Sequence, residues 1–296
     1  MEKYCKKAIF HLPGIFEHAQ FYNYLTSMYR DRREMFYDNL VIGSIYGAPG
    51  NCIWNGGRMI FSVTPKQELE TIKQGMEAVG IPVRFTFTNC LLEERHMYDT
   101  YCNMVATMFS NGNHEILCNS PLLEQYLRKN FPQYQFISST TKRILEAEDL
   151  NKELEKDYKL VVLDYDLNKN KKLLKKIRQK SRVEILCNAV CIPNCENRLE
   201  HYKSISKCQL ECDPDGMLNC EHSNCPFYIA KQRPHFVSRE DINNYLRQGF
   251  CNFKLEGRTA HPLDLTEIIL YYLIRPEYHT EFRERLGGLS WQKEIV

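Results

Sequence analysis

The sequence has no apolar run approaching 18 residues, which excludes a helix that crosses a membrane. Its first residues, Met1-Glu-Lys-Tyr-Cys-Lys-Lys7, lack the apolar stretch and the cleavage site of a signal peptide, so we expect a cytoplasmic protein. The formal net charge is only +2, and this balance indicates no class of partner. No linker rich in Ser, Gly or Pro divides the 296 residues, so we expect a single domain over 1–296.

Cysteine, in contrast, is abundant. Seven of the thirteen cysteines fall in the segment 187–225, directly after the apolar run Val183-Glu-Ile-Leu-Cys187. Thiolates are soft ligands for zinc and for iron–sulfur clusters, so several of them together on an irregular loop predict a metal site. The best candidate ligands flank Pro, Asn, Ser and acidic residues, and they are Cys191, Cys195, Cys220 and Cys225.

Two other interpretations of the cysteines compete with a metal site. A secreted protein would use them as disulfides, but the N-terminus argues against secretion. A cysteine can also be a small buried hydrophobic residue of the core. We expect this of the four cysteines that lie inside apolar patterns, namely Cys90, Cys102, Cys118 and Cys251. Four further cysteines could replace any of the four candidate ligands, and we call them the reserve ligands: Cys52, Cys187, Cys208 and Cys212.

Short apolar runs alternate with helical patterns along the whole chain. This alternation predicts a (β/α)8 TIM barrel with a cysteine-rich insertion after the seventh strand, and a doubly wound open sheet is the alternative. The expected strands are 8–13, 40–46, 81–89, 114–119, 134–140, 159–165, 183–188 and 250–258. The expected helices are 16–38, 65–79, 93–109, 121–130, 142–156, 170–180 and 263–273.

The last expected strand carries three charges on one face. Lys254, Glu256 and Arg258 alternate with Phe253 and Leu255, so in an extended strand the charged side chains point together. The active site of a TIM barrel lies at the carboxyl ends of its strands. We therefore expect Lys254, Glu256 and Arg258 to bind an anionic substrate in the barrel mouth and to set its protonation.

These motifs carry a family resemblance. Phe253-Lys-Leu-Glu-Gly-Arg258, after Phe236-Val-Ser-Arg-Glu-Asp-Ile242 and a cysteine-rich loop, resembles the collagenase-like peptidase family U32. The resemblance implies a TIM barrel, a Cys-ligated [4Fe-4S] cluster and oxygen-independent hydroxylation of RNA bases or of a quinone precursor, with prephenate as an oxygen donor. Some members of the family are described as proteases. The chain departs from the longer members by its crowded cysteines, and Cys52 stands where smaller members have a ligand.

The resemblance favours a [4Fe-4S] cluster, although the cysteine spacing also allows zinc. Arg198 and His201 would then lie beside the ligands as groups that support the cofactor. Our first hypothesis is an iron–sulfur enzyme that performs or assists an oxygen-independent modification of RNA or of a small anionic molecule. The alternatives are a zinc-stabilised barrel that binds a peptide or a partner protein, and a peptidase.

A basic run, Lys169-Asn-Lys-Lys-Leu-Leu-Lys-Lys-Ile-Arg-Gln-Lys180, is a candidate RNA contact. No aromatic residue lies among its charges to stack on bases. The run also fits the solvated face of an outer helix whose Leu173, Leu174 and Ile177 pack inward.

Overall fold

The computed structural model describes residues 4–218, 220 and 225–287. Eight parallel strands pair in chain order, and β8 pairs with β1, so the sheet closes on itself. This closed barrel confirms the expected (β/α)8 fold. The strands are β1 (Ala8–Pro13), β2 (Leu40–Gly47), β3 (Val83–Phe87), β4 (Glu115–Cys118), β5 (Gln135–Ser138), β6 (Leu160–Val162), β7 (Val183–Leu186) and β8 (Asn252–Lys254).

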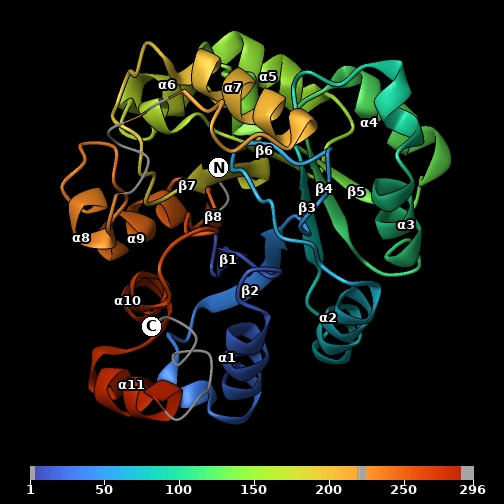
Figure 1. Ribbon diagram of the computed structural model, residues 1–296. Coiled ribbons are helices and arrows are strands. Elements are labelled where there is room, and N and C mark those ends of the chain that lie inside the picture. Colours follow the sequence, from blue (N-terminus) through green and yellow to red (C-terminus); the bar gives the residue numbers. More distant parts are fainter. Residues whose placement is uncertain (1–3, 219, 221–224, 288–296) are drawn as a thin grey trace.

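Helices surround the strands (Figure 1). They are α1 (Ala19–Asp31), α2 (Lys66–Val79), α3 (Thr100–Met108), α4 (Pro121–Asn130), α5 (Ala147–Glu155), α6 (Lys171–Lys176), α7 (Arg198–Glu211), α8 (Phe227–Ala230), α9 (Arg239–Arg247), α10 (Pro262–Leu273) and α11 (His279–Gly287). Short 3-10 turns occupy Arg33–Met35, Glu94–Tyr98, Thr140–Lys142, Tyr165–Leu167, Lys180–Arg182 and Pro276–Tyr278. Within residues 4–218, 220 and 225–287, no helix is long and apolar enough to cross a membrane.

Several helices differ from the expected ones at their ends. The expected helix 93–109 is a 3-10 turn followed by α3, because the Asp99 carboxylate caps α3 by accepting a hydrogen bond from the Cys102 backbone N–H. The cysteine-rich segment, expected to be irregular, contains α7. Arg198, Ser206 and Gln209 are among the buried residues of α7, so its inward face has no apolar stripe that periodicity could reveal.

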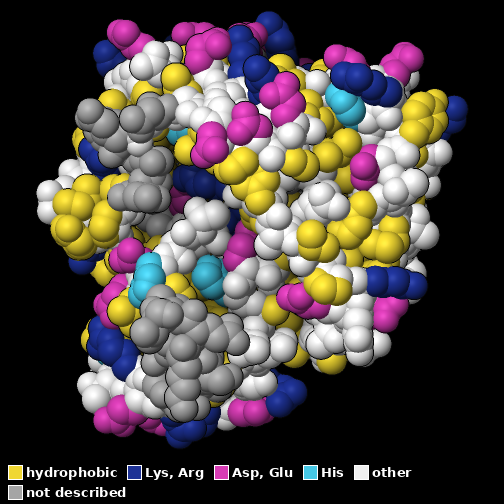
Figure 2. All heavy atoms as spheres, viewed as in Figure 1, with side chains coloured by type: hydrophobic (Ala, Val, Ile, Leu, Met, Phe, Trp, Pro, Cys, Tyr) yellow, Lys and Arg dark blue, Asp and Glu magenta, His cyan; other side chains and the backbone are white. Residues whose placement is uncertain are grey.

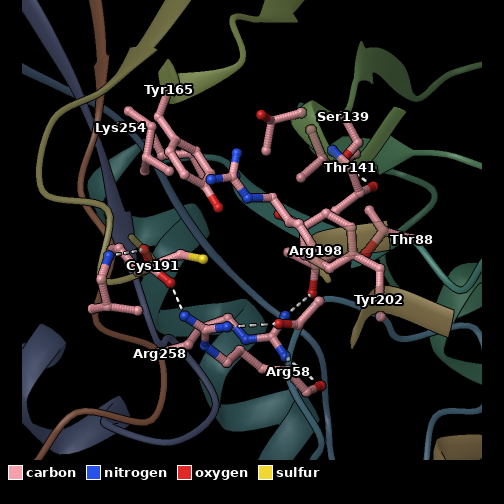
Figure 3. A pocket seen from close by; sticks show the side chains of 18 of the residues that line it. Arg58, Thr88, Ser139, Thr141, Tyr165, Cys191, Arg198, Tyr202, Lys254 and Arg258 are labelled. Atoms are coloured by element: carbon pink, nitrogen blue, oxygen red, sulfur yellow. Dashed lines mark hydrogen bonds and ion pairs between the residues drawn. The ribbon is translucent and has the colours of Figure 1, made fainter. Parts of the chain in front are cut away.

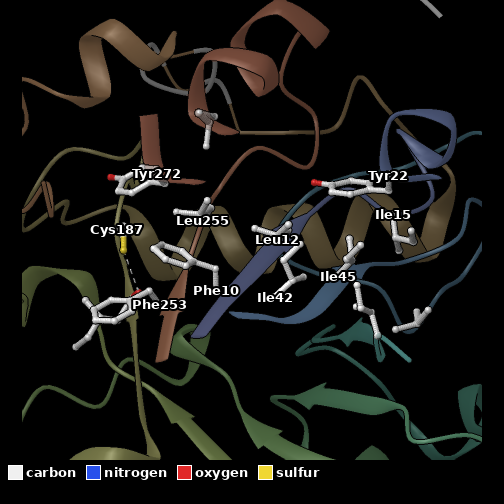
Figure 4. Packing of buried hydrophobic residues seen from close by; sticks show 14 of the residues in the cluster. Phe10, Leu12, Ile15, Tyr22, Ile42, Ile45, Cys187, Phe253, Leu255 and Tyr272 are labelled. Atoms are coloured by element: carbon white, nitrogen blue, oxygen red, sulfur yellow. Dashed lines mark hydrogen bonds between the residues drawn. The ribbon is translucent and has the colours of Figure 1, made fainter. Parts of the chain in front are cut away.

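The main core fills the space between the barrel and the helices. Phe10 of β1 and Phe253 of β8 point outward from adjacent strands, and their ring centroids lie 5.7 Å apart (Figure 4). Phe10 also packs against Tyr272 of α10, at 6.1 Å. Leu255 is fully buried in the same cluster. Because these apolar residues face the helices, the alternate residues of both strands face the barrel interior.

A polar layer occupies the barrel interior near the amino ends of the strands. Arg84 of β3 donates hydrogen bonds to Glu115 Oε2 at 2.7 Å and to Glu184 Oε2 at 2.6 Å, and all three side chains are fully buried. His11 Nδ1 lies 2.8 Å from Arg84 Nη2. Burial by itself would raise the pKa of Glu115, but the positive charge of Arg84 lowers it to about 2. This layer closes one end of the barrel with paired charges, and the pocket described below lies at the other end.

Candidate functional site

A pocket lies at the carboxyl ends of the strands, where a TIM barrel carries its active site. Figure 2 shows a hollow near the middle of the visible face, with Lys or Arg side chains in its depth. The cavity has a volume of about 110 Å³ and suits a small molecule. Its lining includes the polar residues Tyr46, Arg58, Thr86, Thr88, Ser139, Thr140, Thr141, Tyr165, Arg198, His201, Tyr202, Lys254, Glu256 and Arg258, together with Cys191 and Cys220.

Lys254 reaches the pocket from the last residue of β8. Its side chain is only 6% exposed, and Nζ lies 4.2 Å from the centre of the Tyr46 ring. Burial lowers the pKa of Lys254 to about 7; Glu184 acts in the opposite direction, and Arg84 and Arg258 lower the pKa further. Among the described residues, Nζ has no hydrogen-bond or ion-pair partner. The pocket therefore contains an amine that is partly unprotonated at neutral pH.

Arg258 lies beyond the end of β8 and turns back into the pocket after Gly257, whose φ is +153°. Its Nη1 donates to the Thr86 hydroxyl, and its Nη2 donates to Asn55 Oδ1 at 3.0 Å. Its Nε lies 3.6 Å from Glu17 Oε1. These partners come from β3 and from the loops after β1 and β2, and they hold the buried guanidinium in one orientation.

Glu256 has both carboxylate oxygens engaged. Oε1 forms an ion pair with Arg58, and Oε2 accepts a hydrogen bond from the Val190 backbone N–H at 3.0 Å. The backbone of Glu256 exchanges two further hydrogen bonds with the Asn188 side chain, at 2.7 and 2.9 Å. Glu256 thus fastens the first residues of the cysteine-rich segment to the loops after β2 and β8.

Arg198, at the start of α7, is held by acidic residues that follow β6. Its guanidinium donates to Asp166 at 2.6 and 3.1 Å, and it lies 4.1 Å from the centre of the Tyr165 ring. It also donates to the Ile192 carbonyl at 2.8 Å. Asp166 further accepts from the Asn194 backbone N–H at 3.0 Å. Arg198 and Asp166 together shape the chain between Cys191 and Cys195.

Hydroxyl groups form another wall of the pocket. In the view of Figure 3, Lys254 and Tyr165 lie on one side, while Ser139, Thr141 and Thr88 lie on the other. The Ser139 and Thr141 hydroxyls lie 2.9 Å apart. Neutral donors of this kind can orient the oxygen atoms of a ligand without adding charge.

The predicted metal ligands are only partly brought together. Burial raises the pKa of Cys195, and the neighbouring Cys191 side chain raises it further. Cys220 lines the same pocket as Cys191. Cys225 lines a neighbouring pocket, where its thiol lies 3.6 Å from the Pro226 carbonyl oxygen.

The described side chains therefore fit a cluster incompletely. Across 4–218, 220 and 225–287, no three or more His, Cys, Asp or Glu side chains converge closely enough to hold a metal ion. Two neighbouring thiols, Cys191 and Cys195, and Cys220 on the same pocket as Cys191 supply part of a soft ligand set. A complete set of four would require Cys220 and Cys225 to approach the pair formed by Cys191 and Cys195.

The reserve ligands occupy other environments. Cys52 is fully buried with its sulfur 3.2 Å from that of Cys102, between the loop after β2 and helix α3. Cys187 and Cys208 are buried, and Cys212 is exposed. Of the four cysteines expected to be apolar core residues, Cys102 and Cys118 are fully buried, whereas Cys90 and Cys251 are half-buried.

The pocket contains residues that the sequence analysis did not select. Arg58 comes from the glycine-rich loop after β2, and Tyr165 and Tyr202 contribute two phenols. The glycines of this loop are the sequence feature that indicates its close approach to β3. A Cβ on Gly56 would lie 2.5 Å from the Thr88 backbone, so only glycine fits there. His201, expected beside the metal ligands, lines the pocket, and burial lowers its pKa.

No protein-family model matches the chain, and no curated protein matches it. Among solved structures, the structure of this chain is similar to that of the U32 peptidase Mk0906, with a TM-score of 0.52. The match covers 87% of this chain and 95% of that chain, at 13% sequence identity. The chain has the fold of a U32 peptidase. At this identity the likeness concerns the fold alone, and at that level it confirms the resemblance found in the sequence.

Proposed function

We propose that the protein is an enzyme that binds a small anionic molecule in the barrel mouth and performs or assists an oxygen-independent modification of the hydroxylation type. The observation that carries this proposal is the lining of the pocket. Lys254, Arg58, Arg198 and Arg258 line it, against the single carboxylate of Glu256. An excess of cations in a concave, partly desolvated site favours a ligand with negative charge.

The residues of the pocket have different roles in this proposal. The three arginines are held by acidic or carbonyl partners, so their N–H donors have fixed orientations and can orient an anionic ligand. Lys254 has a pKa of about 7, lowered by burial, and so can both accept and donate a proton near neutral pH. Glu256 keeps Arg58 in place and positions the cysteine-rich segment above the pocket.

A [4Fe-4S] cluster is part of the same proposal, with Cys191, Cys195, Cys220 and Cys225 as its ligands. Such a cluster supplies electron transfer or a Lewis-acidic iron when it is bound. Arg198 supports the proposal because it fixes the Ile192 carbonyl between the first two cysteines. His201 lines the pocket on the next turn of α7.

A small molecule is favoured over RNA as the substrate. The lysines of α6 are exposed around the buried Leu173 and Leu174, as expected for the solvated face of an outer helix. They do not line the pocket. A short RNA is therefore the competing ligand against which small anions are compared.

The anion site is tested by thermal stabilisation with a panel of carboxylates, phosphates and a short RNA. We expect small carboxylates or phosphates to raise the melting temperature of the wild type, and Lys254→Met to weaken their binding by roughly tenfold because one charged hydrogen bond is lost. Lys203→Met, at an exposed position of α7 outside the pocket, is the matched control. Stabilisation by RNA alone, or none by any anion, contradicts the proposal.

The cluster is tested separately by metal analysis after purification without oxygen. Iron and sulfide in equal amounts, lost in Cys191→Ser and Cys195→Ser but kept in Cys5→Ser, are the expected result. Cys5 lies at the opposite, amino-terminal side of the barrel, where its thiol donates to the Gly249 carbonyl. Zinc in place of iron supports a zinc-stabilised binding barrel and overturns the cluster.

A further inference from the structure

We propose that the Lys254 amine is a nucleophile that forms a Schiff base with the carbonyl group of a small 2-oxo acid. The inference rests on the anion pocket of the proposed function and adds the substrate class and the bond that forms. It needs neither a metal nor an oxidant.

The position of Lys254 suits covalent chemistry. It is the last residue of β8, so its amine lies where the carboxyl ends of the barrel strands surround the cavity. The neighbouring Tyr46 hydroxyl donates to the Leu255 carbonyl at 2.6 Å, so it does not compete for the amine. Glu184 Oε2 pairs with Arg84 at 2.6 Å, whereas Glu184 Oε1 is buried without a hydrogen-bond partner, and among the described residues no ion pair joins Glu184 to Lys254. The nitrogen is thus available to a ligand, which is unusual for a buried lysine.

The charges around Lys254 favour its neutral form. The positive charges of Arg84 and Arg258 both disfavour a further positive charge on the amine, whereas Glu184 favours one. With burial as the largest cause, the pKa falls to about 7. Only a neutral amine has the electron pair needed to attack a carbonyl carbon, and desolvation next to another cation is an established way to obtain one.

The step balances without a co-reactant. The amine nitrogen attacks the carbonyl carbon, the carbonyl oxygen takes up a proton, and the resulting carbinolamine loses its hydroxyl group as water. The nitrogen loses its two protons in the process, so amine and ketone give imine and water with no change of oxidation state. The Tyr165 and Tyr202 phenols line the same pocket, and burial raises the pKa of both, so they stay protonated and can donate hydrogen bonds to a ligand oxygen, while solvent supplies and takes up the protons.

The rest of the pocket selects a carboxylate beside the carbonyl. Arg58, Arg198 and Arg258 attract a negative charge, and Ser139 and Thr141 offer hydroxyl donors on the opposite wall. The cavity of about 110 Å³ has room for a short chain beside the carbonyl group. These features together describe a short 2-oxo acid, for which pyruvate is the simplest probe.

The test is reductive trapping. The wild-type protein is incubated with pyruvate, reduced with sodium cyanoborohydride and digested, and the modified peptides are identified by mass spectrometry. We expect one dominant adduct on Lys254, more of it at pH 8 than at pH 6, and at least tenfold less with hydroxyacetone, which has a carbonyl group but no charge. Lys203→Arg keeps the adduct, and Lys254→Arg loses it while circular dichroism shows a folded barrel.

The outcomes separate this inference from the proposed function. If pyruvate or other anions stabilise the wild type but leave no adduct on Lys254, the Schiff base is refuted and the anion site stands. Adducts spread evenly over exposed lysines such as Lys152 and Lys203 also refute it. If no anion binds and no adduct forms, both proposals fail.

Discussion

Arg58 and Glu256, 198 positions apart in the sequence, form an ion pair in the wall between two pockets. Both residues line the central pocket and also a second pocket, which extends toward Phe227 and Ile268. The Val190 backbone N–H donates to the same carboxylate. One pair of side chains therefore connects the loop after β2, the loop after β8 and the start of the cysteine-rich segment.

Replacing Glu256 by glutamine removes the carboxylate from the lining of the central pocket and frees Arg58. We expect small anions to bind Glu256→Gln several-fold more tightly, because the variant has no carboxylate that competes with the ligand for Arg58. A gain of about 1 kcal/mol in binding free energy corresponds to a fivefold gain in affinity. Isothermal titration of the variant and the wild type measures the change. Weaker binding by the variant would show that Glu256 itself contacts the ligand.

Lys254 makes the stability of the protein depend on pH above neutrality. Its pKa is about 7 in the folded chain and 10.5 in an exposed lysine, so between these values the unfolded chain binds a proton that the folded chain does not. The free energy of unfolding of the wild type therefore rises with pH across this window, by up to about 5 kcal/mol relative to Lys254→Met. Urea unfolding of both proteins at pH 7, 8.5 and 10 measures this difference. Parallel plots of the free energy of unfolding against pH for the two proteins would contradict the prediction.

Arg84 neutralises two buried carboxylates at the closed end of the barrel. Arg84→Met leaves Glu184 without an ion pair to an arginine, and leaves Glu115 with Lys159 at 2.5 Å as its ion-pair partner. We expect the variant to be less stable by about 3–5 kcal/mol, the usual cost of an uncompensated buried charge. Chemical denaturation at pH 7 measures it. Lys159→Met is the control and should cost less, because Arg84 still pairs with Glu115.

Asp166 holds the turn that contains Cys191 and Cys195. Asp166→Asn weakens its hydrogen bonds with Arg198 and Asn194, and we expect a loss of stability of about 1–3 kcal/mol. Faster hydrogen exchange at residues 191–197 is the local sign of this change. Asp149→Asn, at an exposed position of α5, should leave exchange in that segment unchanged. Equal exchange in both variants would show that Asp166 does not order the turn.

Strand alternation predicted the direction of Lys254, but not its surroundings. The apolar residues Phe253 and Leu255 had to face the helices, so Lys254 had to face the barrel interior. The strand itself ends at Lys254, and Arg258 reaches the pocket by a turn through Gly257 instead of by alternation. Which groups meet the amine depends on seven other strands, whose relative register no local pattern specifies.

The sequence by itself determined the alternation of eight strands with helices and favoured the (β/α)8 barrel over a doubly wound open sheet, and the pairing of β8 with β1 decided between the two. It also placed Lys254, at the end of the last strand, on the face that lines the barrel mouth. Only the tertiary structure decided that Glu256 pairs with Arg58, that Arg198 is held by Asp166, and that Lys254 is left without a hydrogen bond among the described residues. These contacts join residues distant in sequence, so their geometry exists only once the barrel has closed.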